Sequence, residues 1–373
     1  MTESHSTPNA HLTNHPLTSP GHLIASLPGA LGYFPYEAVA VIAFRSNPDK
    51  LDDIEVGPYL CADLGNPAAI DDMLAQIPVR YLVGCVAVVV SRVPESSMVA
   101  EAVGQLHAAV DDFGPLIDAC WTASEVADGT HYELIFGPLP EHVDSLDWGA
   151  DYVSGTVASV MTAQSMQPFI ANGLLPELDR DDTYRHFDPV SGADVATCER
   201  VAQDARARGS ELLELMHVAP SLVKPELERA CEILSGAPRS TLIDSEGDLM
   251  AAEVFHSEEE IVLMAGLLCY SRLRDCLIVV ALEHPREAAA VLLTVARNFT
   301  GVVRANALSL WAMIAVSQNL YPWAYAALHC AAEEVPSHEL TRLVERCLVL
   351  GVVDELFAAC VSGCSDTWHE LGS

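Results

Sequence analysis

The stretch from Tyr81 to Val90 limits the fold more than any other part of the sequence. Its residues are almost all apolar and rich in valine. The run is too short for a membrane helix, which needs roughly 20 apolar residues. Its length and its β-branched side chains instead predict a strand that is covered on both faces, as in a sheet packed between helices.

Helix and strand patterns alternate on either side of this run. Ala38 to Phe44 predicts a second buried strand, and Ile54 to Ala62 predicts the strand that returns beside it. Pro58 lies within the returning strand, which indicates a sheet edge or a bulge because proline cannot donate to the ladder. Helices are expected after Pro67 and from about Pro94.

A hairpin completes this half of the chain. One strand is predicted at Pro115 to Trp121 and its partner at Tyr132 to Phe136, with a turn at Asp128-Gly129. The resulting β-α-β-α-β order implies parallel neighbours joined by right-handed crossovers, while the hairpins make the sheet mixed. A first helix is expected from Ser19 to a stop at Pro28-Gly29, and another near Val157 to Ile170.

The second half of the chain has a helical pattern from about Ala193 onward. Its candidate helices include 195–208 and 210–217, with a break at Gly209, and a final helix at 351–361. Short loops between the candidate helices predict antiparallel hairpins. The stretch 301–336 also has the spacing of one tetratricopeptide repeat, in Ala312, Ala324, Leu328, Ala331 and Pro336.

These patterns predict an α/β domain followed by an all-α domain. We expect a disordered leader at 1–18, a mixed sheet with flanking helices at 19–190, and tetratricopeptide-like helical hairpins at 191–373.

Charge and cysteine content exclude several classes of partner. The chain has 52 acidic and 19 basic residues, a formal net charge of −33, which disfavours nucleic acid and anionic membranes. Its 11 cysteines are an odd number and lie largely in apolar contexts, as buried reduced thiols do. The polar N-terminus lacks the order of a signal peptide, so a cytoplasmic location is expected.

The commonest nucleotide and hydrolase motifs are absent. Neither lysine of the sequence, Lys50 or Lys224, lies in a glycine-rich turn, and no G-x-G-x-x-G follows a strand. A G-x-S-x-G nucleophile motif is also missing, and Ser91 is expected to end its strand rather than to attack a substrate. We therefore expect no cofactor.

Two groups of side chains have spacings that metals use. Cys360 and Cys364 lie four residues apart and near His369, but zinc sites usually have closer cysteines and four ligands. Asp182 and His186 are also four apart and lie near Asp179, on what we interpret as a solvated face. Cys269 and Cys276 share one helix face and are assigned to the core. We predict no metal.

Two weak candidates remain for recognition. The first is the loop Gly32-Tyr33-Phe34-Pro35-Tyr36-Glu37, with Gly32, Tyr33, Pro35 and Glu37 as binding residues; in the alternative that we favour, Tyr33 and Phe34 cover the open end of the sheet. The second is a partner groove in the helical domain lined by Trp311, Trp323 and Tyr325, although aromatic residues at helical spacing are more often core.

Three stretches resemble a known family. Leu31 to Pro35 running into Ala38 to Val41, the junction Ala171 to Gly173, and the Ala/Leu-rich hairpins of 285–362 are similar to domain-of-unknown-function family 4192, an actinobacterial family. The resemblance covers about 17–362 and implies an α/β part followed by a helical part. It implies no activity.

The resemblance also implies a feature that this chain lacks. Many members have a cysteine-rich loop after the second hairpin, but the matching region here, Phe136 to Val143, contains no cysteine.

Two functions fit these patterns. The first is a non-enzymatic protein that binds a protein partner through its helical hairpins. The alternative is a small-molecule-binding protein or an enzyme that uses the α/β domain, near the carboxyl ends of its strands.

Overall fold

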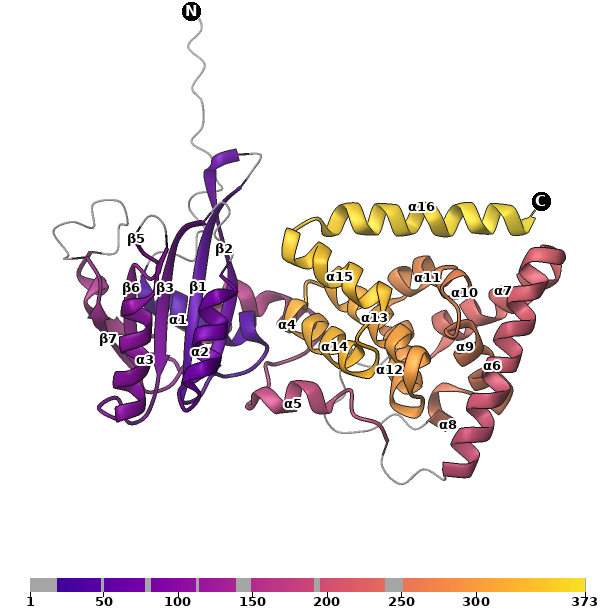
Figure 1. The fold of residues 1–373 in the computed structure, drawn as a ribbon, viewed down its shortest axis with the longest axis horizontal. Coiled ribbons are helices and arrows are strands. Elements are labelled where there is room, and N and C mark those ends of the chain that lie inside the picture. Colours follow the sequence, from indigo (N-terminus) through magenta and orange to yellow (C-terminus); the bar gives the residue numbers. More distant parts are fainter. Residues whose placement is uncertain are drawn as a thin grey trace, which may run out of the picture. The chain divides into compact units, whose positions relative to one another are not determined.

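The structure is a computed structural model that describes residues 19–47, 50–77, 82–111, 114–138, 149–190, 195–238 and 251–372 (Figure 1). It divides into two compact units. The α/β unit comprises Met1–Ala171 and Leu175–Arg180, and the helical unit comprises Asn172–Leu174 and Asp181–Ser373. The predicted boundary at 190/191 falls inside the helical unit. The predicted leader at 1–18 lies outside the described residues.

The α/β unit contains a six-stranded sheet with the order β2-β1-β3-β6-β7-β8. Among the neighbouring strands that the structure describes in this sheet, only β3 and β6 are parallel, so the predicted mixed sheet is confirmed. The strands are β1 (Ala38–Asn47), β2 (Lys50–Asp63), β3 (Leu82–Val90), β6 (Ala119–Ala123), β7 (His131–Phe136) and β8 (Ser154–Thr156), with β4 (Val110–Asp111) and β5 (Gly114–Pro115) forming a separate small ladder.

The hairpin of β1 and β2 explains why parallel pairing is rarer than the sequence implies. β1 lies between β2 and β3 and is antiparallel to both. The crossover that leaves β2 therefore passes over β1 and reaches β3 without pairing β2 and β3. Only the next crossover, from β3 to β6, joins adjacent strands.

Pro58 lies where its chemistry predicts. β2 is the edge strand, and its register against β1 shifts between the pairs Ile42–Tyr59 and Phe44–Val56. Pro58 falls inside this shift, so the predicted edge and the predicted bulge are both confirmed.

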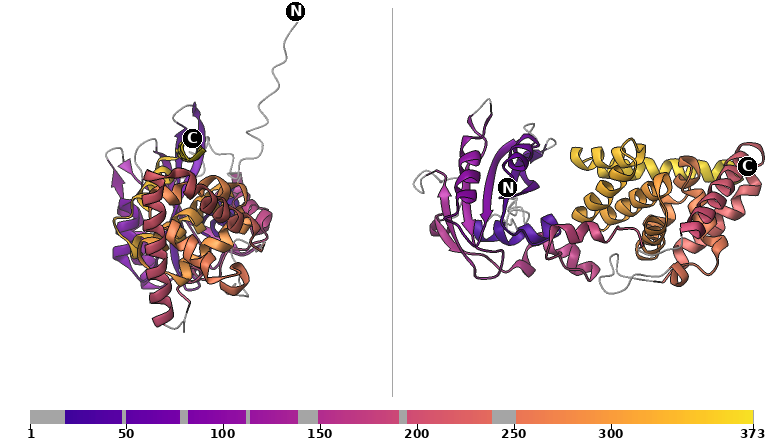
Figure 2. Two further views of the ribbon diagram at one scale, coloured as in Figure 1. Left: turned by 90° about the vertical axis from the view of Figure 1, so that its right-hand side faces the viewer. Right: turned by 60° about the horizontal axis from the view of Figure 1, so that its bottom comes forward.

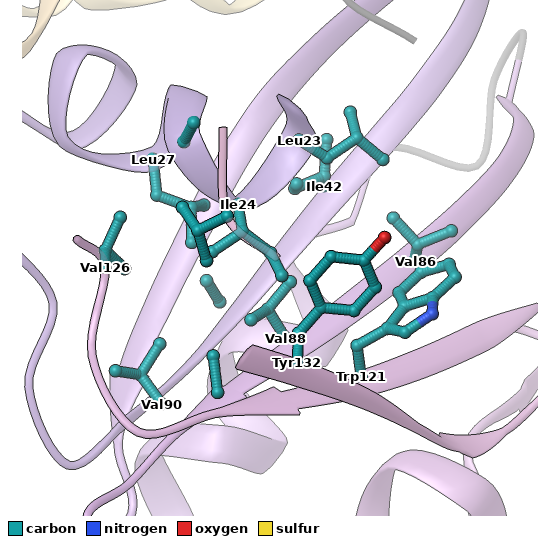
Figure 3. Packing of buried hydrophobic residues seen from close by; sticks show 14 of the residues in the cluster. Leu23, Ile24, Leu27, Ile42, Val86, Val88, Val90, Trp121, Val126 and Tyr132 are labelled. Carbon is teal, nitrogen blue, oxygen red and sulfur yellow. The ribbon is translucent and has the colours of Figure 1, made fainter. Parts of the chain in front are cut away.

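Helices cover both faces of the sheet (Figure 1). α1 (Pro20–Leu31) packs on one face, and α2 (Pro67–Ala75) with α3 (Ser97–Ala108) packs on the other. Figure 3 shows Trp121 and Tyr132 packed together with the apolar side chains of α1. Successive residues alternate between the faces: Ala40, Ile42, Val86, Val88 and Trp121 face α1, while Val39, Val41, Cys85, Ala87 and Cys120 face α2 and α3.

α1 does not stop at Pro28-Gly29 as predicted. It continues to Leu31 and ends at Gly32, whose φ of 84° is left-handed and whose N–H donates to the Pro28 carbonyl at 2.8 Å. Pro28 lies in the last turn of α1 and, without an N–H, cannot donate to the carbonyl of Ile24, yet the helix continues past it. Gly29 is needed for close approach, because a Cβ there would lie 2.5 Å from the Ser165 backbone.

The predicted helix at Val157 to Ile170 is wrong. The chain instead forms 3-10 turns at η3 (Val160–Thr162) and η4 (Gln164–Met166), and only α4 (Gln167–Asn172) is an α-helix. The backbone N–H groups at the start of this stretch donate to distant partners and not along an α-helix. The Ala158 N–H donates to the Gly21 carbonyl, and the Val160 N–H donates to the Asp128 carboxylate at 2.8 Å.

The helical unit forms helices and no strand among its described residues. Its elements are α5 (Arg180–Arg185), α6 (Val195–Val218), α7 (Pro220–Gly236), α8 (Ala251–Val254), α9 (Glu258–Leu267), α10 (Ser271–Asp275), α11 (Ile278–Glu283), α12 (Pro285–Asn298), α13 (Gly301–Ser317), α14 (Tyr321–Glu334), α15 (Glu339–Leu350) and α16 (Val353–Gly372). In the described ranges, no helix combines the length and the apolar character needed to cross a bilayer.

Two predicted helix ends are wrong for packing reasons. α6 runs without a break through Gly209, where a Cβ would lie 2.3 Å from the Gly266 carbonyl oxygen of α9. The glycine thus allows two helices to cross closely and does not end one. α16 continues past the predicted end at residue 361, because Cys364 and Leu371 are buried. Figure 2 shows α16, in yellow, along the outside of the helical unit.

Candidate functional site

The predicted recognition loop is mostly buried. Gly32, Tyr33 and Pro35 are buried, so these three weak candidates do not form a recognition surface. The Phe34 N–H donates to the Glu177 carbonyl at 2.9 Å, which ties the loop to a neighbouring segment of the α/β unit. These contacts fit the alternative in which the loop covers the end of the sheet.

Tyr33 has a side-chain partner in the edge strand. Its side chain is hydrogen bonded to the thiol of Cys61 in β2. Burial raises the pKa of Cys61 to about 11, so this thiol is neutral at physiological pH.

Glu37 is the one member of the loop that faces a strand end. Its φ of 44° is left-handed, which is unusual for a glutamate. Its carboxylate accepts hydrogen bonds from the Ser91 hydroxyl at 2.7 Å and from the Arg92 backbone N–H at 2.9 Å. Ser91 is only 1% exposed. This pair fixes the carboxyl end of β3, and Ser91 has a structural role as predicted.

The surface beside this pair is charged. Arg92 forms an ion pair with Glu125 at 3.0 Å and lies 5.5 Å from the ring centroid of Tyr36. Tyr36 is 60% exposed and is the solvent-facing aromatic residue of the loop.

A pocket of about 250 Å³ opens next to this end of the sheet. We call it the β6 pocket. Val99, Ala100 and Val103 of α3 form one wall, Pro94 and Ser96 of the preceding loop a second, and Thr122 of β6 with Ile135 of β7 the floor. It lies at the carboxyl ends of β3 and β6, where α/β folds commonly bind ligands.

Thr122 of β6 lies on the floor of the β6 pocket. It pairs with Val89 near the end of the parallel ladder, and strand alternation points it away from the α1 face that Trp121 occupies. Its hydroxyl is buried and has no hydrogen-bond partner among the residues that the structure describes. The oxygen is closed off from solvent, so it lies beneath the floor of the pocket and is not open to a ligand in it.

Sequence reasoning missed this pocket. The strand was predicted to end at Trp121, so Thr122 was treated as loop. The signal in the sequence was a hydroxyl in a run of otherwise apolar residues, Ala119-Cys120-Trp121-Thr122-Ala123.

The helical unit does not form the predicted partner groove. Trp311 and Trp323 are 0% and 1% exposed, so they are core residues and line no surface. The Phe187 ring packs edge-on against Trp311 at 4.9 Å, and His186 packs against Trp323 at 4.8 Å. Of the three predicted residues only Tyr325, at 46% exposure, faces solvent.

A different pocket exists in the helical unit. It has a volume of about 580 Å³ and lies between α7, α11 and α16, and we call it the α16 pocket. Trp368 lines it, and the Trp368 indole N–H donates to the Cys276 carbonyl at 3.1 Å. Lys224, Glu228 and Glu283 bring charge to its rim.

Three thiols from different parts of the helical unit also line the α16 pocket, namely Cys231, Cys276 and Cys364. Burial, with a smaller effect of the neighbouring thiols, raises the pKa of Cys231 and of Cys276 to about 12. The Cys364 thiol donates to the Cys276 carbonyl at 3.5 Å. Within the described ranges, no three His, Cys, Asp or Glu side chains are gathered to hold a metal ion.

The remaining predicted candidates have separate partners. Asp182 pairs with Arg185, whereas His186 packs on Trp323. His369, near Cys360 and Cys364 in the sequence, is exposed at the end of α16 and lines the α16 pocket with Cys364 but not Cys360. Cys276 is buried as expected, while Cys269 is half-buried.

The helical unit also contains a buried polar cluster, formed by Arg274, Asn306, His338 and Thr341. The Asn306 side-chain carbonyl accepts from Arg274 at 2.5 Å and pairs with His338 at 2.9 Å. The other His338 ring nitrogen lies 2.8 Å from the Thr341 hydroxyl. Burial and, second, the Arg274 charge hold the pKa of His338 below its ordinary value of 6.5. We assign this cluster to stability.

A family comparison decides the classification. The model of a domain of unknown function, DUF4192, matches residues 20–355 of the 373. The chain belongs to the DUF4192 family. No curated protein and no solved structure matches it.

The DUF4192 match extends over both units, from α1 to the start of α16. It therefore includes the β6 pocket and most of the helices around the α16 pocket. The family description names no activity.

Proposed function

We propose that this DUF4192 chain is a small-molecule-binding protein that takes its ligand in the β6 pocket of the α/β unit. The observation that carries the proposal is the place of that pocket, at the carboxyl ends of the parallel strands β3 and β6, where α/β folds commonly bind ligands.

The elements around the β6 pocket support the same proposal. It lies beside the parallel strand pair β3 and β6 and next to the first turn of α3. The loop between them is held in place by Glu37, whose unfavourable backbone conformation is maintained by two hydrogen bonds to Ser91 and Arg92. Strain of this kind is concentrated at functional sites.

A pocket-filling variant tests the proposal. Ala100 lines the β6 pocket on an exposed part of α3, so Ala100→Phe fills the space with little effect on folding. Ala108→Phe is the matched control, since Ala108 is exposed on the same helix but does not line the pocket. In a fragment screen followed by NMR, ligands that shift β6 and α3 resonances should lose binding in A100F and keep it in A108F. Equal binding to both variants would contradict the proposal.

A second candidate function is the binding of a protein partner through the helical unit. The α16 pocket favours it, because Trp368 is a typical interface anchor and is held in place by its bond to Cys276. We infer that α13 and α14 form a tetratricopeptide-like hairpin that supports such a surface; they follow one another over the predicted repeat.

Blocking the α16 pocket tests this second function. Ser365 is exposed and lines the pocket, whereas Ser362 is exposed on the same helix and does not. A partner recovered with the wild-type chain should be lost with Ser365→Trp and retained with Ser362→Trp. Recovery of the same partner with both variants would place its binding elsewhere.

We also propose a cytoplasmic location. All 11 cysteines are free, in agreement with a reducing compartment.

A further inference from the structure

We propose that His338, the N-cap residue of α15, is a pH-sensitive switch within the buried polar cluster of the helical unit. The neutral ring accepts the Thr341 backbone N–H and caps α15, and the protonated ring releases that N–H and weakens the start of the helix. This proposal concerns the helical unit and does not depend on ligand binding in the β6 pocket.

The cluster joins three helices. Arg274 comes from α10, Asn306 and Ser309 come from α13, and His338 and Thr341 lie at the start of α15. None of these five residues is more than 8% exposed. Hydrogen bonds in so buried a site are strong, and an unpaired donor or acceptor there is costly. The position of each hydrogen therefore follows from the groups around it.

The neighbours of the His338 ring fix its neutral tautomer. The Asn306 side-chain N–H donates to the Leu268 carbonyl at 2.7 Å, so the Asn306 Oδ1 is the atom that faces the ring. The His338 Nε2 lies 2.9 Å from this oxygen, which can only accept, so Nε2 carries the hydrogen. The Nδ1 atom accepts the Thr341 backbone N–H at 3.4 Å and therefore carries none.

The neutral cluster has one hydrogen too few for its contacts. The Thr341 hydroxyl lies 2.8 Å from the His338 Nδ1 and 2.8 Å from the Ser309 hydroxyl, which also lies 2.8 Å from the Ala305 carbonyl. These three contacts require three hydrogens, whereas the two hydroxyls have one each. A proton from solvent that binds Nδ1 supplies the third. Nδ1 then donates to Thr341, Thr341 donates to Ser309, and Ser309 donates to Ala305.

Proton uptake also removes the cap of α15. A protonated Nδ1 is a donor, so it no longer accepts the Thr341 backbone N–H. The positive ring lies at the N-terminus of α15, which is the positive end of the helix dipole. Both effects destabilise the first turn of α15, while the bond from Nε2 to Asn306 in α13 is kept.

The charged groups around the ring set the pH of the switch. Burial and, second, the Arg274 charge hold the pKa of His338 below its ordinary value of 6.5, and the Glu339 carboxylate in the first turn of α15 opposes them. Asp275 pairs with Arg274 at 2.6 Å. The α13 helix brings the uncharged Asn306 to the ring, and in the described part of the chain no charged side chain of α14 or α16 is hydrogen bonded to it. The switch therefore operates below about pH 6.5.

Nitrogen NMR of the imidazole rings in the full chain tests the tautomer and the switch. His338→Asn identifies the His338 signals, because they are lost from those of the 14 histidines. At pH 7.5 the wild-type ring should carry its hydrogen on Nε2. As the pH falls, Nδ1 should gain a proton with a midpoint below 6.5, and the Thr341 backbone amide signal should move with the same midpoint.

Thr341→Val tests the chain of hydroxyls. The variant keeps the side-chain shape and removes the hydroxyl that accepts from a protonated Nδ1, so the midpoint should fall by about half a pH unit or more. Thr367→Val on α16 is the matched control, because the Thr367 hydroxyl donates to the Gly363 carbonyl outside the cluster, and its midpoint should equal that of the wild type.

Three results would each overturn the proposal. They are a hydrogen on Nδ1 at pH 7.5, a Thr341 amide signal that does not follow the ring, and an unchanged midpoint in T341V. The first two are measured on the wild-type chain, so they decide the proposal even if T341V does not fold.

Discussion

The Ser91 hydroxyl donates a 2.7 Å hydrogen bond to the Glu37 carboxylate, which joins the start of β1 to the end of β3. β1 and β3 are antiparallel neighbours, so this contact closes the end of the sheet at which the β6 pocket opens. Removing it should loosen the pocket without removing any residue that lines it.

Ser91→Ala should therefore destabilise the end of β3. The variant deprives a half-buried carboxylate of one partner, which costs about 1–2 kcal/mol. Hydrogen–deuterium exchange of peptides from β3 should become roughly tenfold faster. Ser124→Ala is the control, because Ser124 is exposed at the end of β6. Equal exchange in the two variants would show that the contact with Glu37 contributes little.

Gly209→Ala should destabilise the helical unit strongly. Its new Cβ would lie 2.3 Å from the Gly266 carbonyl oxygen, so α6 and α9 have to move apart. Overpacking of this kind costs about 1–3 kcal/mol. Gly363→Ala is the matched control, because a Cβ at that helical position meets nothing within 4 Å. The control should gain up to about 1 kcal/mol from helix propensity. Urea unfolding followed by circular dichroism compares the two.

Stability of the helical unit should fall with acidification because of His338. Its folded pKa lies below 6.5, so the unfolded chain binds a proton that the folded chain refuses. The contribution is fully present above about pH 6.5 and is lost as the pH falls from there toward the lower folded pKa. His338→Asn, which can still cap α15, should lose less stability between pH 7.5 and 5 than the wild type. The same loss in both proteins would contradict a role for His338 in this dependence.

The thiols of Cys231 and Cys276 should resist alkylation. Burial raises the pKa of each from 9.0 to about 12, so at neutral pH they form about a thousand-fold less thiolate than an unperturbed thiol. Iodoacetamide at pH 7.5, followed by peptide mass spectrometry, should leave both unmodified in the folded protein. Both should react once urea unfolds the chain. Rapid labelling of either one in the native state would contradict the raised pKa of these thiols.

Much of the architecture follows from local sequence patterns. The apolar run ending at Val90 forms the central strand β3, and Asp128-Gly129 forms the hairpin turn between β6 and β7. The periodicity of apolar residues determines which residues are buried, and glycine provides the left-handed backbone of the turn at Gly129.

Local patterns failed where a distant segment supplied the partner. Gly209 resembles a helix break, but the carbonyl of Gly266 in another helix explains it. Trp311 and Trp323 fit a surface groove by spacing, yet Phe187 and His186 from a preceding segment cover them. Neither partner lies within the sequence window from which a helix is predicted.

The sequence by itself determined that this protein has an α/β part and a helical part, because side-chain periodicity and β-branched composition are local properties. Only the tertiary structure decided where the β6 pocket lies. The order β2-β1-β3-β6 brings the carboxyl ends of β3 and β6 together, and α3 then encloses Thr122 without giving its hydroxyl a partner. Whether a polar atom is paired depends on all the segments around it, and no local pattern contains that information.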